Sequence, residues 1–402
     1  MLLRIYSEYL NFSLPELKSV LPIIVISQFC CTSLWFAGNG VMSDLLKTYG
    51  LDILALGHLT SAVQFGFIMG TLIFAFLSIA DRFPPSRVFF ICAIVGAFCN
   101  LGVILDNNDL NSLLLWRFLT GFSLAGIYPV GMKIAADHYR KGLGKSLGFL
   151  VGALVIGTAF PHLLKTITGS EGLPWRAVII STSVLATIGG IFILFFVPQG
   201  QYRTARISVD HLAFIKVFRN AKFRSAAFGY FGHMWELYTF WAFVPVILTA
   251  FTLTHPGTEL NIPLLSFFII AIGGISCVAG GYISVNRGAK RTAATALSLS
   301  GICCLISPLI FFQNSEVLLV AFLLIWGAMV VADSPLFSTL VANNAEGESR
   351  GTALTIVNSI GFAITILSIQ LVTYLVTFTN PLYIFPVLAI GPVFGLGKLL
   401  KS

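Results

Sequence analysis

The chain has 402 residues, of which 57% are hydrophobic and only 10% are charged, and its mean hydropathy is +0.91. Soluble domains carry about 25% charged residues, so this chain lacks the polar side chains needed to cover a soluble protein of its size. The net charge of +8 comes from basic residues scattered over short loops, without the basic stripe and interleaved aromatic residues of a nucleic-acid-binding protein. Lipid must therefore cover most of the surface.

Apolar runs long enough to cross a bilayer as helices, which takes about 20 residues, occur in two sets of six. The first set lies at 18–43, 54–80, 88–105, 112–136, 143–164 and 175–197, and the second at 225–251, 262–285, 292–312, 317–341, 351–377 and 380–397. We predict an all-α membrane protein with twelve transmembrane helices. Its domains would be a six-helix bundle at 1–197, a linker at 198–224 and a second six-helix bundle at 225–402.

Lysine and arginine residues predict the orientation, because short cytoplasmic loops are enriched in them. One set of alternate loops contains Arg82, Arg87, Arg140, Lys141, Lys145, Arg203, Arg206, Lys216, Arg219, Lys222, Arg224, Arg287, Lys290, Arg291 and Arg350. The other loops contain only Lys47, Lys165 and Arg176. We expect both termini on the cytoplasmic side of an inner membrane. Residues 1–20 lack the cleavage pattern of a signal peptide, so we expect none to be removed.

The segment Ser208–Lys222 lies within the predicted linker. It alternates apolar residues such as Phe214 and Phe218 with basic residues such as Lys216 and Arg219, a pattern typical of an amphipathic helix on the inner leaflet. An ordinary surface loop is the alternative.

The two halves share an internal repeat. Ala80-Asp81-Arg82 matches Val285-Asn286-Arg287, and Tyr128-Pro129 matches Ser334-Pro335 at nearly the same spacing. Proline removes a backbone hydrogen bond from a helix, so we expect paired bends in the fourth and tenth helices. Two parallel six-helix repeats of this kind hold their substrate near the bilayer midplane, between the halves.

Three motifs resemble those of the major facilitator superfamily, and the likeness covers essentially the whole chain. The segment 77–87 resembles that family's G-x-L-x-D-R-x-G-R-R loop but lacks its glycines, whereas the second copy at 281–291 keeps the glycines and has Asn286 in place of the acid. Arg117, Gly121 and Ala125 fit the R-x-x-x-G-x-x-x-A pattern of proton-coupled members. The resemblance implies a fold of two parallel six-helix repeats.

Two weaker likenesses point within the family. The glycines at 148, 152 and 157 before Pro161 resemble a signature of drug–proton antiporters, and the run 233–238 resembles members near the cyanate-type carriers.

Three ionisable residues at predicted membrane depth are candidates for proton coupling. Glu236 lies near the middle of the seventh span, with His233 three positions earlier on the same helical face. Asp333 directly precedes the Ser334-Pro335 bend. Ionisable residues inside membranes are costly and usually functional. The alternatives are structural hydrogen bonds between helices and, for Asp333, a place near the inner surface in a network with Arg287 and Arg350.

Candidate substrate-binding residues are polar or aromatic groups inside the spans, the types that orient ligands in apolar pockets. They are Arg117, Asn39, Tyr238, Asn358 and Trp35. For Arg117 a structural clamp on neighbouring carbonyl groups is an equal alternative, and for the others it is ordinary packing.

Charged and polar residues in the two repeated loops are candidates for an inner gate. They are Asp81, Arg82, Arg87, Asn286, Arg287 and Arg291. Charge-assisted hydrogen bonds among such groups can lock one state of a carrier. The alternative is a loop turn whose charges only set the topology.

We therefore expect a secondary transporter that moves a small organic solute by alternating access, coupled to protons. Small-anion uptake with Arg117 as the ligand, or uncoupled facilitation, is the alternative. The chain has no phosphate-binding loop and no hydrolase or metalloprotease motif, so an enzyme is not expected. Its seven cysteines lack metal-ligand spacing, so no metal or cofactor is expected. The expected partners are the solute, protons and lipid, with no nucleic acid, and the chain is expected to be a monomer.

Overall fold

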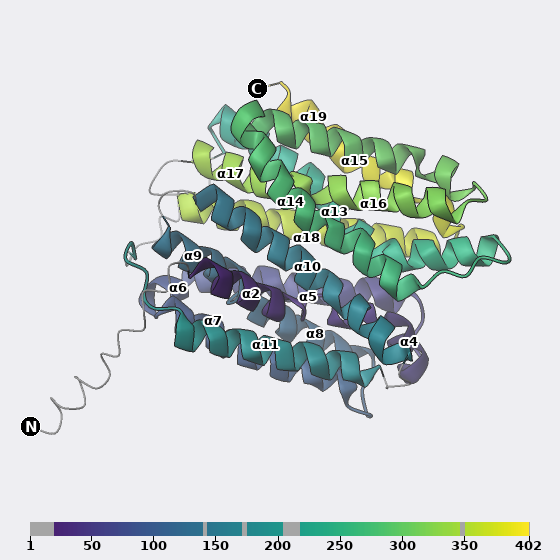
Figure 1. Cartoon of the computed structure of the whole chain (residues 1–402), viewed down its shortest axis with the longest axis horizontal. Coiled ribbons are helices and arrows are strands. Elements are labelled where there is room, and N and C mark those ends of the chain that lie inside the picture. The colour runs from purple at the N-terminus through teal and green to yellow at the C-terminus, as the bar shows by residue number, and fades with distance from the viewer. Residues whose placement is uncertain (1–19, 140–142, 171–174, 204–217, 346–349, 402) are drawn as a thin grey trace, which may run out of the picture.

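The structure is a computed structural model that describes residues 20–139, 143–170, 175–203, 218–345 and 350–401. Long helices run side by side along the longest axis of the molecule (Figure 1). Up to residue 203 they are α2 (Leu21–Thr32), α3 (Ala37–Gly40), α4 (Met42–Tyr49), α5 (Leu54–Phe76), α6 (Ile79–Arg82), α7 (Pro85–Leu101), η1 (Gly102–Ile104), α8 (Leu110–Leu124), α9 (Tyr128–His138), α10 (Leu143–Ser170) and α11 (Arg176–Phe196). From residue 218 they are α13 (Ala221–Thr254), α14 (Ile262–Arg287), α15 (Ala289–Phe311), α16 (Glu316–Ala332), α17 (Ser334–Asn344), α18 (Arg350–Val376), η2 (Pro381–Tyr383), η3 (Phe385–Ala389) and α19 (Ile390–Leu399).

In the described part of the chain, 11 helical segments are long and apolar enough to cross a membrane. The segment α2–α4 is interrupted and supplies a twelfth crossing. Large apolar side chains cover the outside, for example Phe98 and Phe195, which are 68% and 70% exposed. Such a surface suits lipid and not water. The predicted all-α membrane fold is confirmed.

The helices form two groups, one from the first half of the chain and one from the second, which occupy opposite sides of Figure 1. The seam between them is formed mainly by α10 against α14 and by α5 against α18. The predicted boundaries at 197/198 and 224/225 stay predictions.

Both ends of the described chain lie at the same end of the bundle, which we call the linker end. The amide of Leu21 donates to the hydroxyl of Tyr139 at the end of α9, and the hydroxyl of Ser225 in the first turn of α13 bonds the carbonyls of Lys398 and Leu399. The loop 50–53 and the loop 255–261 lie at the opposite end, which we call the far end. An even number of crossings follows.

Helix starts follow ordinary capping chemistry. Asp109 and Ser112 form a reciprocal capping box before α8, and Ser315 and Asn261 cap α16 and α14. Because the backbone N–H and hydroxyl of Ser112 bond to it, the pKa of the Asp109 carboxyl lies below its ordinary value.

The first crossing corrects the predicted helix at 18–43. It is broken at residues 33–36 and continues as α3 and α4 to Tyr49. The hydroxyls of Thr32 and Ser33 donate to the carbonyls of Gln28 and Cys30, at 2.8 and 2.7 Å, and hydroxyls that bond back in this way bend helices.

The fourth and tenth crossings also break, at the matching positions predicted from the repeat. α9 and α17 both carry proline near their first turn, as Pro129 and Pro335. Asp333 forms the junction between α16 and α17.

Paired glycines hold corresponding helices together in the two halves. A Cβ atom at Gly121 of α8 would lie 2.0 Å from the carbonyl oxygen of Val63 on α5, and one at Gly327 of α16 would lie 2.0 Å from that of Ile269 on α14. Small residues allow such backbone contact, which drives helix association in membranes. Gly121 and Gly327 are separated by the same number of residues as Pro129 and Pro335. The internal repeat therefore also includes the glycines at which these helices pack closely.

Gly121→Ala is therefore expected to destabilise the protein, because the methyl group meets a backbone carbonyl that cannot rotate away. Overpacking of this kind costs about 1–3 kcal/mol. Thermal unfolding of the purified protein measures it, with Gly281→Ala as the control because a Cβ at helical Gly281 meets no atom within 4 Å. Equal stability of the two variants would contradict the packing argument.

Candidate functional site

A narrow cavity of about 30 Å³ lies at the seam between the two groups of helices. This volume is far below the range of small-molecule pockets, about 300–1,000 Å³, so the two halves must move apart before a solute fits between them. Its lining comes from both halves: Tyr128, Val151, Leu154, Val155, Tyr230, Met234, Leu237, Tyr238, Trp241, Val331, Ser334, Ser338, Asn358 and Phe362. Two of the predicted binding residues, Tyr238 and Asn358, are among them.

Aromatic rings close the seam beside this cavity. Trp35 stacks on Tyr238 and Phe362, with ring centroids 5.8 and 5.6 Å apart, and Phe67 packs 4.6 Å from Phe362. Trp35 and Phe67 belong to the first half, and the other two rings belong to the second. The predicted residue Trp35 thus reaches the cavity wall through its stacking partners.

Closer to the far end, polar and close-packed contacts continue the closure. The side-chain amide of Gln370 on α18 donates to the hydroxyl of Ser61 on α5 at 2.9 Å. Gly57 of α5 lies directly against Thr373 of α18. We call the two contacts, Ser61–Gln370 and Gly57–Thr373, the far seal.

His233 and Asp333 form a buried pair behind the cavity wall. Nδ1 of His233 lies 2.8 Å from Oδ1 of Asp333, and both side chains are 1% exposed. Asp333 occupies the break of the tenth crossing, directly before Ser334, which lines the cavity. The alternative for Asp333, a network with Arg287 and Arg350 near the inner surface, has no support among the described contacts, in which Asp333 faces His233 and Arg287 is exposed.

Glu236 lies inside the second half and is 0% exposed. Its carboxylate accepts hydrogen bonds from the hydroxyl of Ser300 at 2.9 Å, the thiol of Cys304 at 3.2 Å and the indole N–H of Trp326 at 2.6 Å. Three donors satisfy most of what a carboxylate requires. Glu236 does not line the described cavity, and its role in proton coupling stays a prediction.

Arg117 is 1% exposed and lies against the broken first crossing. Its guanidinium donates to the carbonyls of Leu34 and Trp35 and to Oδ1 of Asn100 at 3.2 Å. The break frees those carbonyls, and a guanidinium with five donors can bond several of them at once. This geometry favours the structural clamp.

Asn39 also makes a contact between helices. Its side-chain amide donates to the hydroxyl of Thr60 on α5 at 2.8 Å, and it is not among the residues that line the cavity. Its predicted role in substrate binding has no further support in the described contacts.

At the linker end, Asp81 pairs with Lys133 of α9 at 2.9 Å, and the guanidinium of Arg203 donates to the carbonyls of Asp81 and Phe83. Lys133 and Arg203 were not among the predicted gate residues. Five predicted gate residues instead have exposed side chains: Arg82, Arg87, Asn286, Arg287 and Arg291. The inner-gate assignment stays a prediction.

Most of the predicted amphipathic linker helix, residues 208–217, lies outside the described residues. Residues 218–220 form a turn and α13 begins at Ala221, so Lys222 belongs to the seventh crossing.

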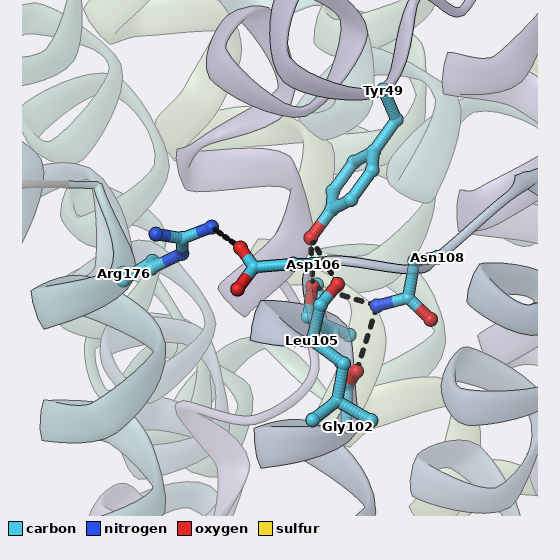
Figure 2. Close-up of polar contacts among 7 residues, drawn as sticks. Tyr49, Gly102, Leu105, Asp106, Asn108 and Arg176 are labelled. Atoms are coloured by element: carbon cyan, nitrogen blue, oxygen red, sulfur yellow. Dashed lines mark hydrogen bonds and ion pairs between the residues drawn. The ribbon is translucent and has the colours of Figure 1, made fainter.

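At the far end, side chains hold down the loop between α7 and α8 (Figure 2). The hydroxyl of Tyr49 donates to the carbonyls of Val103 and Leu105, at 2.8 and 3.0 Å. The amide of Asn108 donates to the carbonyl of Gly102 at 2.8 Å, and Arg176 pairs with Asp106. The end of α4 is thereby tied to the third and sixth crossings.

Tyr49→Phe removes the hydroxyl that serves two carbonyls, and we expect the midpoint of thermal unfolding to fall. The loss is about 1 kcal/mol, since a typical hydrogen bond contributes this much. Tyr374→Phe is the control, because Tyr374 is 59% exposed. A midpoint that does not change in Tyr49→Phe would show that the loop is held without this contact.

The model of the Major Facilitator Superfamily matches residues 24–397. Among curated proteins, the niacin transporter NiaP of Acinetobacter baylyi is 26% identical over 170 residues, which span 37% of this chain and only 38% of the relative. That alignment covers well under half of either protein.

Solved transporter structures share the fold. The proton:xylose symporter XylE has a TM-score of 0.76 at 14% identity, over 95% of this chain and 94% of that one. The human organic anion transporter MFSD10 has a TM-score of 0.72 at 14% identity, over 96% and 100% of the two chains. The nucleoside transporter NupG has a TM-score of 0.71 at 15% identity, over 95% and 99%. The family match over nearly the whole chain is decisive: this protein belongs to the major facilitator superfamily and is a multi-pass membrane transporter of small solutes, not an enzyme.

Proposed function

We propose that this protein is a proton-coupled secondary transporter that moves a small organic solute across the inner membrane by alternating access. In this proposal the protein is a monomer with both termini in the cytoplasm, and the cavity between the halves is the solute site. The lining of that cavity by both halves supports the proposal, because a site shared in this way is remade whenever the halves rock against each other.

The pair of His233 and Asp333 carries the coupling part of the proposal. An imidazole and a carboxyl group in contact can hold one proton or two between them, and the two states differ by a full charge in a place without water. A charge that is unpaired there is costly. Proton uptake therefore changes the free energy of the local packing, and it does so at the break of the tenth crossing beside the cavity.

Glu236 is the second proton candidate in this proposal, with a site inside the second half. The assignments of Asp81, Arg82, Arg87, Asn286, Arg287 and Arg291 to an inner gate belong to the proposal as well, now with Lys133 as the partner of Asp81. The placement near the cyanate-type or drug–proton antiporter-like members rests on the sequence likeness alone.

Accumulation of a solute panel in proteoliposomes tests the proposal. The panel comprises sugars, nucleosides, aromatic amides, organic acids and amines, with and without an imposed pH gradient. We expect at least one solute to accumulate above equilibrium with the gradient and to lose that excess when an uncoupler is added. If every transported solute reaches the same internal concentration with and without the pH gradient, the protein is instead an uncoupled facilitator.

A further inference from the structure

The described lining of the central cavity contains no acidic, basic or histidine side chain. The buried charged groups of the surrounding helices are engaged elsewhere. Arg117 bonds the carbonyls of the first crossing, and His233 and Asp333 face each other. An ion that enters such a site loses its hydration without gaining a partner of opposite charge, which costs several kcal/mol in real proteins. The cavity therefore penalises charged solutes.

Several polar groups at the cavity have no hydrogen-bond partner within the described part of the protein, and a solute could supply one. The indole N–H of Trp241 is buried without a hydrogen bond, and within the described part of the chain neither the side-chain amide of Asn358 nor the hydroxyl of Tyr238 is bonded. An indole N–H can only donate, and an amide donates through its NH₂ group. A fitting solute must then present at least one acceptor for the indole N–H of Trp241, such as a carbonyl or ring nitrogen atom, whereas Asn358 and Tyr238 can pair with either donors or acceptors.

Aromatic rings in contact with one another form one wall of the cavity. Tyr238 and Phe362 lie 5.2 Å apart by ring centroid, and Tyr238 and Trp241 are also 5.2 Å apart. Aromatic faces bind other planar π-systems in offset-stacked or edge-on geometry. The other wall is aliphatic, with Val151, Leu154 and Val155 of α10. A sugar-like ring with hydroxyls on all sides would leave several of them unpaired against this aliphatic wall.

We propose that the solute of this cavity is an uncharged, planar, nitrogen-containing or carbonyl-bearing ring compound, held by Trp241, Asn358 and Tyr238. The proposal rests on the proposed transport function and specifies its substrate class. It disfavours the small-anion alternative, in which Arg117 would have to leave the carbonyls of Leu34 and Trp35.

Matched neutral and charged compounds test the solute class on the purified full-length protein. The pairs are nicotinamide with nicotinate, benzamide with benzoate and with benzamidine, and uridine with its monophosphate. Binding is followed by tryptophan fluorescence and by thermal stabilisation at equilibrium in detergent. We expect at least one neutral ring compound to bind about tenfold or more tightly than its charged counterpart, a difference of about 1.4 kcal/mol.

Two outcomes overturn this proposal. One is a panel in which no neutral compound binds more tightly than its charged counterpart, and the other is a panel in which no neutral compound binds at millimolar concentration. Because no proton gradient is present, a failure of proton coupling leaves this result unchanged. Conversely, an ionic substrate that accumulates with the pH gradient would refute the solute class and leave the coupling intact.

Substitutions locate the bound compound. Asn358→Leu and Trp241→Phe are expected to weaken binding of the neutral compound by about tenfold each, because each removes a hydrogen-bond donor. Asn314→Leu is the control, since Asn314 lies exposed in the loop before α16. Full binding by both cavity variants would place the compound elsewhere.

Discussion

Asp333→Asn is expected to abolish gradient-driven accumulation while solute exchange continues. Asparagine has nearly the same shape and can occupy the same place beside His233, so the break of the tenth crossing should remain. It cannot exchange a proton, so the pair loses the second protonation state that the proposed coupling requires. With a gradient of about one pH unit, one proton per solute supports about tenfold accumulation, because one unit is about 1.4 kcal/mol. In the Asp333→Asn variant this tenfold accumulation should disappear.

The measurement compares two assays on the same proteoliposomes, gradient-driven uptake and counterflow without a gradient. His233→Gln should behave like Asp333→Asn. Glu236→Gln is the informative comparison, because Ser300 can accept from the new amide while Trp326 and Cys304 still donate to its oxygen. Loss of coupling in Glu236→Gln with normal coupling in Asp333→Asn would assign the proton to Glu236.

Arg117→Leu is expected to unfold the first half or leave it barely stable. The guanidinium supplies donors to the carbonyls of Leu34 and Trp35 and to Oδ1 of Asn100, all buried. Each buried polar group left without a partner costs about 1–3 kcal/mol. The Leu34 carbonyl keeps the N–H of Ala37 as a donor, so two groups, the Trp35 carbonyl and Oδ1 of Asn100, lose their partner. Two such groups amount to a sizeable part of the stability of a typical domain, about 5–15 kcal/mol.

The amount of folded protein after extraction and its unfolding temperature report this loss. Arg117→Lys should keep part of the stability, because an ammonium group donates from one point and cannot span the same carbonyls. Arg219→Leu, at an exposed position before α13, is the control. If the Arg117→Leu protein is stable and has lost only the binding of an anionic solute, then Arg117 is a substrate ligand, as the small-anion alternative predicts.

The membrane fold could be predicted from the sequence because each crossing is a separate run of apolar residues that lipid must cover. The breaks in the fourth and tenth crossings were also predictable, since Pro129 and Pro335 each remove a backbone hydrogen bond. The break in the first crossing was not. No proline lies between Thr32 and Ala37, and the break depends on hydroxyls that bond locally and on Arg117 more than 80 residues away.

The candidate site was only partly predictable for the same physical reason. Residue type and depth identified His233, Glu236 and Asp333 as buried ionisable groups, but their partners lie far away along the chain. Asp333 meets His233 across 100 positions, and Glu236 meets Ser300 and Trp326 from two other helices. Spacing along one helix suggested contact between His233 and Glu236, whereas tertiary packing directs them to different neighbours.

Alternating access requires that the two halves separate at the far seal, and a cross-link there tests the account most directly. The side chains of Ser61 and Gln370 are in contact across the seam, and the seven native cysteines are buried. In a Ser61→Cys, Gln370→Cys double variant, a short thiol-reactive cross-linker should stop transport, and reduction of a cleavable version should restore it. Each single variant treated alike should transport normally. Continued transport with the link in place would contradict the account.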